Sequence, residues 1–397
     1  MKKRGILIMA KPCSSVVHAV EGSTTVAISD RARQLQQEGI DVINLGSGDP
    51  DFNTPQHIQE AAIESMKSGF THYVDSKGTP QLRKAVAEKY RREEGLSYDP
   101  NSEIIATASG KVALYIALAT LVEPGDEVLI LEPAWVSYRP IIQLLKGIPV
   151  GVPLQFENNF LITDTIMEQY VTKKTKAIIV NSPNNPTGRV LSVPELESIK
   201  RIAERYDLWV LTDDIYEKII YDGRIHKTLA ALPGMRERTI VINGMSKAYA
   251  MTGWRLGYLA GPSSIVEEIL KVQQHLITCA ASFTQVAGVA ALEGGYGCIN
   301  TMVAEYDKRR GAITAALNRI PGINCPLPEG AFYFFPRVDY KGMNSFELAK
   351  YLLDVAHVAV TPGIAFGESG EGCIRLTYAI SLANLQEGVK RIEQALK

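Results

Sequence analysis

Short apolar runs alternate with longer amphipathic stretches between about residue 103 and residue 260. The runs are continuous in Val, Ile and Leu, which is typical of strands buried on both faces, and the stretches between them have the length of helices. This alternation predicts an α/β fold in which a mostly parallel sheet lies between helices. The expected strands are residues 103–107, 127–131, 177–181, 208–212, 239–243 and 256–260, and the expected helices include 110–121, 135–145 and 193–206.

The two ends of the chain differ from this pattern. Residues 1–50 predict an N-terminal arm with one helix at 30–38, which also forms part of a small domain. We expect a large domain over residues 51–295 and the rest of the small α+β domain over residues 296–397. The elements expected in this last part are helices 299–319, 345–356 and 382–396 and strands 331–338, 358–361 and 372–378.

The composition is that of a soluble globular protein. Of the 397 residues, 46% are hydrophobic and 21% are charged, and the net charge of -1 implies no basic face for nucleic acid. Five cysteines without C-x-x-C spacing exclude a zinc knuckle and fit a reducing compartment. The apolar run at residues 6–10 is short for a signal peptide and far too short for a membrane span. We therefore expect a cytoplasmic protein without nucleic-acid or membrane partners.

Polar residues follow several of the expected strands, at the point where each strand ends. The carboxyl ends of parallel strands share one edge of the sheet, and ligands bind there in open α/β sheets. Paired aspartates, Asp213 and Asp214, could bind a metal, but no histidine lies near enough in sequence to complete an obvious site, so we expect none. The residues that follow strands are Ser109, Gly110, Lys111, Asn185, Asp213 and Lys247.

The segment 243–258 contains the most informative of these residues. Lys247 stands next to Ser246 in a turn after an apolar strand, and Arg255 follows. A Schiff-base lysine needs an amine held in a partly dry pocket, and the small and apolar neighbours of Lys247 argue against a freely solvated side chain. Ser246 and Arg255 could bind a phosphate close by. A serine hydrolase is a distant alternative, because Ala248 replaces the last glycine of its G-x-S-x-G motif.

This segment closely resembles the lysine signature of class I pyridoxal-phosphate aminotransferases, and several other motifs match the family in the same order over roughly residues 20–397. The resemblance implies a seven-stranded sheet, a homodimer with shared active sites, and pyridoxal 5′-phosphate as cofactor. It implies transfer of an amino group from an L-amino acid to a 2-oxo acid with ping-pong kinetics. Lyases, decarboxylases and synthases on the same scaffold stay open as alternatives. A transcription-factor-type sensor is not expected, because too few residues precede the core for a DNA-binding domain.

The resemblance also implies roles for individual residues. Lys247 forms the Schiff base and, when free, moves the proton from the α-carbon. Asn185, in the N-P-T-G motif at residues 185–188, donates to the cofactor's phenolate oxygen, and the Tyr216 hydroxyl bonds the same oxygen. Asp213 pairs with the protonated pyridine nitrogen and keeps the ring an electron sink. Contacts to the phosphate are implied for Ser109, Gly110, Lys111, Ser246 and Arg255.

Four further residues complete the implied site. Trp135, at the expected start of a helix, stacks on the pyridine ring and borders the substrate, as Asn185 does. Tyr73 reaches the phosphate of the neighbouring subunit. Gly46 and Arg375 hold the substrate's α-carboxylate, although a structural ion pair is the alternative for an arginine among apolar residues.

The identity of the substrate depends on the side-chain pocket. Some aspartate aminotransferases of this group have a lysine in a matching G-K step, where it meets the distal carboxylate of the substrate, and Lys111 matches it. The alternative is that Lys111 only supports the phosphate, with Arg139 and Arg337 as other candidates for the distal carboxylate. We therefore expect aspartate or glutamate as one substrate, with aromatic or neutral amino acids as the runner-up.

Overall fold

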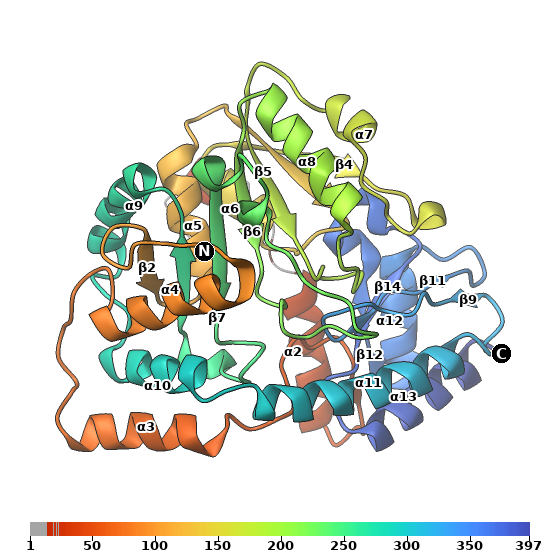
Figure 1. Ribbon diagram of the computed structural model, residues 1–397. Coiled ribbons are helices and arrows are strands. Elements are labelled where there is room, and N and C mark those ends of the chain that lie inside the picture. Colours follow the sequence, from red (N-terminus) through yellow and green to blue (C-terminus); the bar gives the residue numbers. More distant parts are fainter. Residues whose placement is uncertain (1–13, 19, 21, 23) are drawn as a thin grey trace, which may run out of the picture.

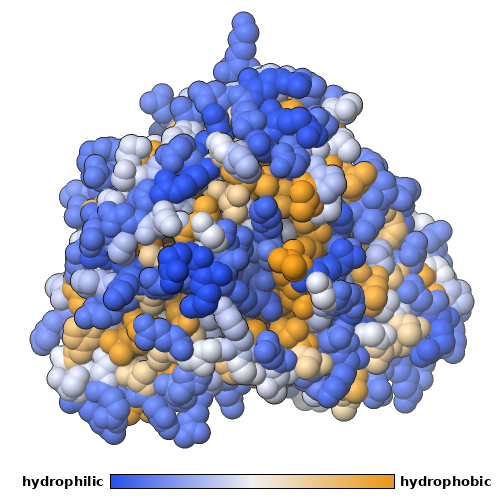
Figure 2. All heavy atoms as spheres, in the orientation of Figure 1, coloured by the Kyte–Doolittle hydropathy of each residue, from blue (hydrophilic) through white to orange (hydrophobic). Residues whose placement is uncertain are grey.

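The computed structural model describes residues 14–18, 20, 22 and 24–397 (Figure 1). The apolar run expected near the N-terminus, at residues 6–10, lies outside the described residues. Among the described helices, none is both long enough and apolar enough to cross a membrane. Hydrophilic side chains cover most of the surface seen in Figure 2, and hydrophobic ones gather in smaller patches between them.

A seven-stranded sheet forms the centre of the molecule, in the order β2-β8-β7-β6-β5-β3-β4. All neighbouring strands are parallel except β8, which is antiparallel to both β2 and β7. The prediction of an α/β fold with a mostly parallel sheet is therefore confirmed. The strands are β2 (Ile104–Thr107), β3 (Glu127–Glu132), β4 (Ile148–Pro153), β5 (Thr175–Asn181), β6 (Trp209–Asp213), β7 (Thr239–Gly244) and β8 (Gly257–Ala260).

Strand β4 is absent from the elements expected from the sequence. It contains Pro149, Gly151 and Pro153, residues that normally argue against a strand. The structure places β4 at the edge of the sheet, where it pairs only with β3. A proline is tolerated in an edge strand because its missing N–H can face away from the sheet.

Helices cover both faces of this sheet because successive residues of a strand point to opposite sides. In β2, Ile104 packs with side chains of α3, α4 and α10, whereas Ile105 packs with those of α5 and α9. Helices α7 and α8 complete the layers against β3, β5 and β6. The helices are α3 (Gln56–Lys67), α4 (Pro80–Glu94), α5 (Gly110–Leu121), α6 (Tyr138–Leu144), α7 (Asp164–Glu168), α8 (Val193–Arg205), α9 (Ser263–Leu276) and α10 (Ser282–Glu293).

Helix α2 (Thr24–Gln37) lies among the C-terminal elements, in a second group of elements beside the large sheet (Figure 1). Strand β14 lies between β10 and β13 in an antiparallel sheet, and β1 near the N-terminus pairs in parallel with β12. The elements here are α2 (Thr24–Gln37), β1 (Ile43–Asn44), α11 (Gly297–Leu317), β9 (Ile323–Asn324), β10 (Tyr333–Phe334), β11 (Arg337–Val338), α12 (Ser345–Ala356), β12 (Val358–Ala359), β13 (Thr361–Pro362), β14 (Ile374–Thr377) and α13 (Leu382–Ala395). The short helix α1 (Ser15–His18) instead contacts α6 of the large part.

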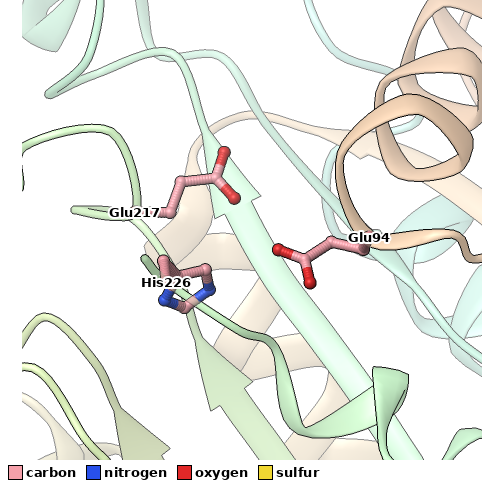
Figure 3. Close-up of side chains that lie close together, drawn as sticks. All are labelled: Glu94, Glu217 and His226. Carbon is pink, nitrogen blue, oxygen red and sulfur yellow. The ribbon is translucent and has the colours of Figure 1, made fainter. Parts of the chain in front are cut away.

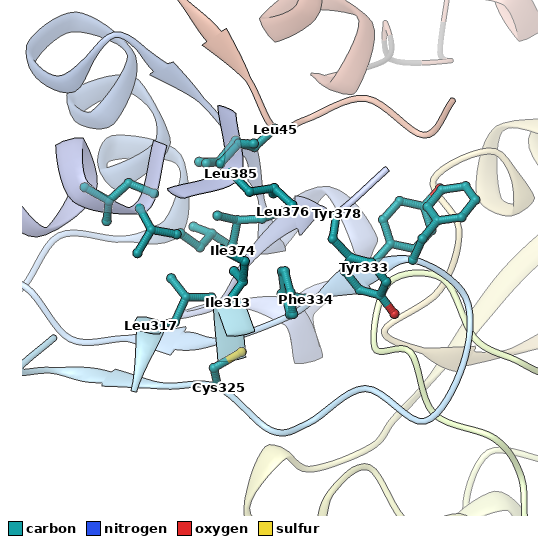
Figure 4. Close-up of a cluster of buried hydrophobic side chains, with 14 of the residues drawn as sticks. Leu45, Ile313, Leu317, Cys325, Tyr333, Phe334, Ile374, Leu376, Tyr378 and Leu385 are labelled. Carbon is teal, nitrogen blue, oxygen red and sulfur yellow. The ribbon is translucent and has the colours of Figure 1, made fainter. Parts of the chain in front are cut away.

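One hydrophobic cluster holds this smaller part together (Figure 4). Leu45 from the N-terminal part packs in the same cluster as Leu376 and Leu385 from the C-terminal part, and all three are almost fully buried. Helix α11 joins the two parts, since Ile299 at its start belongs to a cluster of the large sheet and Leu317 at its end belongs to this one. This packing supports the division into segments 1–50, 51–295 and 296–397, which we keep as a proposal.

Candidate active site

A cavity of about 440 Å³ lies at the carboxyl ends of the parallel strands, which is in the usual size range of small-molecule sites. Strand register explains why its residues meet: Asn181 at the end of β5 pairs with Asp213 at the end of β6. All of the site residues predicted from the sequence line this cavity except Tyr73. They are Gly46, Ser109, Gly110, Lys111, Trp135, Asn185, Asp213, Tyr216, Ser246, Lys247, Arg255 and Arg375.

Lys247 is placed by the turn that follows β7. Its Nζ atom donates to the carbonyl oxygen of Gly48 at 2.6 Å and lies 5.8 Å from the ring centre of Phe332. Burial lowers the pKa of Lys247 to about 8, and the nearby Arg375 and Arg255 charges act in the same direction. Lys247 is therefore not a solvated surface lysine, and far more of its amine is neutral and nucleophilic near neutral pH than in an exposed lysine.

Asp213 is buried at the last position of β6. The hydroxyl of Tyr138 donates to its Oδ2 atom at 2.8 Å. Burial raises the pKa of Asp213 to about 6, although the Tyr138 hydrogen bond favours the charged form. A cationic N–H group beside this carboxylate would supply the missing counter-charge, which is what a protonated pyridine nitrogen offers. Tyr138 has no motif of its own in the sequence, so nothing there could have identified this contact.

Asn185 and Arg375 are connected by a hydrogen bond across the two parts of the molecule. The Nη1 atom of Arg375 donates to Oδ1 of Asn185 at 3.0 Å, and its Nη2 atom donates to the carbonyl of Gly46 at 2.7 Å. Arg375 is buried, its Nε has no partner, and in the described part of the chain no carboxylate pairs with it. This arrangement does not support a structural ion pair. Burial lowers the pKa of Arg375, and a bound carboxylate would satisfy its charge.

Tyr216 is buried and its hydroxyl lies 2.8 Å from that of Tyr333. The ring of Tyr333 lies under the Arg375 guanidinium, with 4.5 Å between the Cζ atom and the ring centre. Tyr333 therefore belongs to the cavity, and sequence reasoning missed it because Tyr333 lies in an apolar strand without a distinctive motif. The expected strand over 331–338 is also split into β10 and β11, with Pro336 between them.

The start of α5 forms another part of the cavity wall. Ser109 caps this helix through a hydrogen bond from the Val112 N–H at 3.4 Å, and its own backbone has φ 118° and ψ 159°, a conformation that is costly for any residue except glycine. Gly110 and Lys111 are the first residues of the helix, where free N–H groups favour an anion. Arg255 brings a guanidinium to the same cavity and donates to the Thr252 carbonyl at 2.8 Å. Such a set of groups suits a phosphate.

Trp135 and Lys111 lie against each other at the cavity wall, with 4.8 Å between Nζ and the indole ring. Burial and the charge of Arg255 lower the pKa of Lys111. Trp135 does not start a helix as the sequence suggested, because α6 begins only at Tyr138. The turn before α6 is what points Trp135 into the cavity.

The structure also places the two other arginines considered for the distal carboxylate, and it places Tyr73. Arg139 pairs with Glu132 and Arg337 with Glu157, and neither arginine lines the cavity, so neither is available for a distal carboxylate there. Arg33 of α2 does line the cavity and was missed, since no motif marks it. Tyr73 is 84% exposed and lies outside the cavity of the single chain. Its contact with a neighbouring subunit stays a prediction.

Comparison with known proteins decides the family. Residues 40–392 match the family described as aminotransferase class I and II. The chain belongs to this family.

The similarity to known relatives extends over nearly the full length of this chain and of each relative. The aspartate aminotransferase of Pyrococcus abyssi is 45% identical over 90% of this chain and 92% of its own, and the aromatic-amino-acid aminotransferase 2 of Thermococcus litoralis is 43% identical over 94% and 99%. Among solved structures, the aspartate aminotransferase from Thermus thermophilus with maleate has a TM-score of 0.93 at 36% identity and covers 98% of this chain and 100% of its own.

The protein is therefore an aminotransferase that depends on pyridoxal phosphate, as members of this family do. The cavity fits that cofactor on its own evidence. It has a helix start and an arginine for a phosphate, a buried carboxylate for a ring N–H, and an amine with a lowered pKa.

The lowered pKa of Lys247 predicts how its amine responds to pH. Only a neutral amine reacts with an acylating reagent, so labelling of Lys247 in the cofactor-free protein should rise with pH through about 8 and then level off. Surface lysines, with pKa values of about 10.4, should still gain reactivity above pH 9. Mass spectrometry of labelled peptides measures both profiles in one sample. A Lys247 profile that follows the surface lysines would contradict the lowered pKa.

Proposed function

We propose that this aminotransferase transfers the amino group of aspartate or glutamate to a 2-oxo acid. The observation that carries this proposal is a pair of cationic groups at one cavity, the Arg375 guanidinium and the Lys111 ammonium, to which the described residues offer no carboxylate partner. Arg255 and Lys247 are likewise without one, but the proposal assigns them to the cofactor. A dicarboxylic amino acid has an α-carboxylate for one and a distal carboxylate for the other. The relatives named aspartate aminotransferase, one of them solved with the dicarboxylate maleate, support this choice.

The proposed roles follow from what surrounds each group. Bound pyridoxal phosphate supplies an electron sink that lowers the cost of removing the α-proton. The Asp213 carboxylate would hold a protonated ring nitrogen, while Asn185 and Tyr216 would donate hydrogen bonds to the ring oxygen. Lys247 would hold the cofactor, and its free amine would accept the α-proton. A pKa of about 8 suits that task because a general base works best when its pKa is near the operating pH.

Aromatic substrates are the second candidate, and one observation favours them. Trp135 and Tyr333 line the same cavity, and the Lys111 ammonium lies against the indole face, where a ring could displace it. The Thermococcus litoralis relative is named for aromatic amino acids. We rank this candidate below the dicarboxylic substrates because an aromatic side chain would leave the Lys111 charge without a partner.

We also propose a homodimer with shared active sites and a cytoplasmic location. The exposed side chain of Tyr73 is an apolar surface that a second subunit could bury, with its hydroxyl placed for the neighbour's phosphate. For the location, the support is that Cys279, Cys298, Cys325 and Cys373 are all free thiols, as is usual in a reducing compartment.

Replacing Lys247 or Asp213 tests the proposed chemistry. Lys247→Ala should abolish transamination, and Asp213→Asn should lower kcat on the order of 10²-fold or more without comparable loss of thermal stability, because the ring nitrogen loses its counter-charge. The exposed ion-pairing residue Lys271 offers a matched control, Lys271→Ala, which should retain activity. Turnover is followed with aspartate and 2-oxoglutarate. Transamination by Lys247→Ala would disprove the assignment.

Lys111→Ala tests the substrate class. Losing a charge-assisted contact costs about 1.5–3 kcal/mol, so kcat/KM for aspartate and glutamate should fall about 10- to 150-fold. The values for alanine and phenylalanine should change little, as should all values for the exposed-lysine control Lys308→Ala. A donor screen against 2-oxoglutarate, oxaloacetate and pyruvate gives these numbers, and product analysis separates transamination from decarboxylation or elimination. Equal losses for both substrate classes would restrict Lys111 to supporting the phosphate.

Light scattering tests the shared site. The active protein should have twice the chain mass of 43.5 kDa. Tyr73→Phe should weaken cofactor binding by about tenfold or more, since a hydrogen bond to a charged group is lost, while leaving the mass unchanged. A monomer with full activity would rule out shared active sites.

A further inference from the structure

A second group of ionisable side chains, one buried and two half-buried, lies away from the cavity (Figure 3). It consists of Glu94 at the end of α4, Glu217 in the segment after β6, and His226 further along the chain. One ligand atom from each of the three lies within 4.8 Å of the others. None of the three lines the cavity, so the proposed transamination does not use them.

Local sequence explains how Glu94 reaches this position. Helix α4 is capped by the side chain of Thr79 and has Pro80 at its first turn, and it stops at Gly95, whose φ of 68° is favoured by glycine. Glu94 is therefore the last residue of the helix. Figure 3 shows its carboxylate directed from the helix end toward His226 and Glu217.

The imidazole of His226 lacks the hydrogen bonds that a buried ring normally makes. Its side chain is only 6% exposed, and neither Nδ1 nor Nε2 has a hydrogen-bond partner. The Oδ2 atom of Asp214, which also lacks one, lies 3.4 Å from Nε2, and the buried hydroxyl of Thr228 is a further atom without a partner. Nearly all buried polar atoms in proteins are hydrogen-bonded. Because Nε2 faces the Asp214 carboxylate as an ion pair, Nδ1 is the imidazole atom that a ligand would satisfy.

The carboxylates near His226 are also incompletely balanced by positive charge. The buried ammonium of Lys89 is shared between Glu217, at 2.8 Å, and Glu93, at 3.2 Å. Lys218 also pairs with Glu93. Among the described residues, the N–H of Thr228, at 3.4 Å, is the single hydrogen-bond donor to Glu94.

We propose that Glu94, Glu217 and His226 bind a divalent transition-metal cation of the Zn²⁺ type. One imidazole nitrogen with two carboxylate oxygens is a ligand set that Zn²⁺ accepts, with water at the remaining position. Bonds of about 2.0–2.2 Å require the three side chains to draw together from their present spacing. Asp214 stands beside the imidazole, where carboxylates commonly orient a ligating histidine.

The cation would act on the segment that carries the catalytic groups. Asp214 directly follows Asp213, the last residue of β6, and Glu217 directly follows Tyr216 in the turn after this strand. Asp213 and Tyr216 line the cavity. A cation held by Glu217 on one side would therefore restrain this turn against α4. The paired aspartates did not predict a metal site because no histidine is close in sequence, but the fold brings His226 to Asp214.

Zinc binding to the cofactor-loaded protein tests the proposal. After treatment with a chelator, equilibrium dialysis against ZnCl₂ and elemental analysis should give one zinc per chain in the wild type. Glu94→Gln preserves the size and the acceptor for Thr228 but loses the charge, so it should weaken zinc binding at least about tenfold. His226→Phe should do the same. His275→Gln, at an exposed histidine, is the matched control and should bind like the wild type.

Two further readouts separate this site from other zinc ligands. Zinc should raise the unfolding temperature of the wild type and of His275→Gln but not that of Glu94→Gln. X-ray absorption spectra at the zinc edge should show nitrogen and oxygen atoms as the zinc ligands. The proposal is overturned if the wild type retains no stoichiometric zinc, if Glu94→Gln and His275→Gln bind zinc equally, or if the ligands include sulfur from the half-buried Cys279 or Cys298.

Discussion

The side chain of Asn181 connects the strand ends on which the site depends. Its amide nitrogen donates to the backbone oxygen of Asp213 at 2.7 Å, and its oxygen accepts the backbone N–H of Asn185 at 2.9 Å. Asn185 in turn accepts from Arg375 of β14. A continuous series of hydrogen bonds therefore runs from the end of β6, through β5 and its loop, to the smaller part of the molecule. Because these groups are buried, breaking one bond would leave others unsatisfied, so the spacing between Asp213 and Arg375 is strongly determined.

Burial in the cavity shifts the pKa values of a basic and an acidic side chain in opposite directions. The pKa of Lys247 falls to about 8 and that of Asp213 rises to about 6, in both cases because desolvation disfavours the charged form. Without a partner these groups cost stability. A cationic group beside Asp213 would remove the first cost, and a ligand that uses the neutral amine of Lys247 would remove the second. The same burial that destabilises the empty site would thus favour such a ligand, which couples ligand affinity to folding stability.

Much of this organisation could be predicted from the sequence, for a physical reason. Residues such as Asp213 and Lys247 follow strands that are continuous in apolar residues, and the ends of parallel strands must share an edge. Contacts made by residues without a motif could not be predicted, because they depend on packing between distant segments. Tyr138, Tyr333 and Arg33 are of this kind. Strand β4 was missed because its prolines are acceptable only at a sheet edge, and a single sequence does not show which strand lies there.

The turn after β6 shows how one short segment serves two environments. Asp213 and Asp214 are adjacent, and extended backbone directs adjacent side chains to opposite sides. Asp213 therefore faces the cavity and Asp214 faces His226, although both are buried carboxylates. Their surroundings differ. His226 helps to hold the pKa of Asp214 below its usual value against the effect of burial, whereas desolvation dominates at Asp213.

A change at the His226 side, such as binding a cation or losing the imidazole, therefore alters the charge next to Asp213 without touching the cavity. The negative charge of Asp214 raises the pKa of Asp213, so screening that charge would lower the pKa of Asp213 and favour its ionised carboxylate.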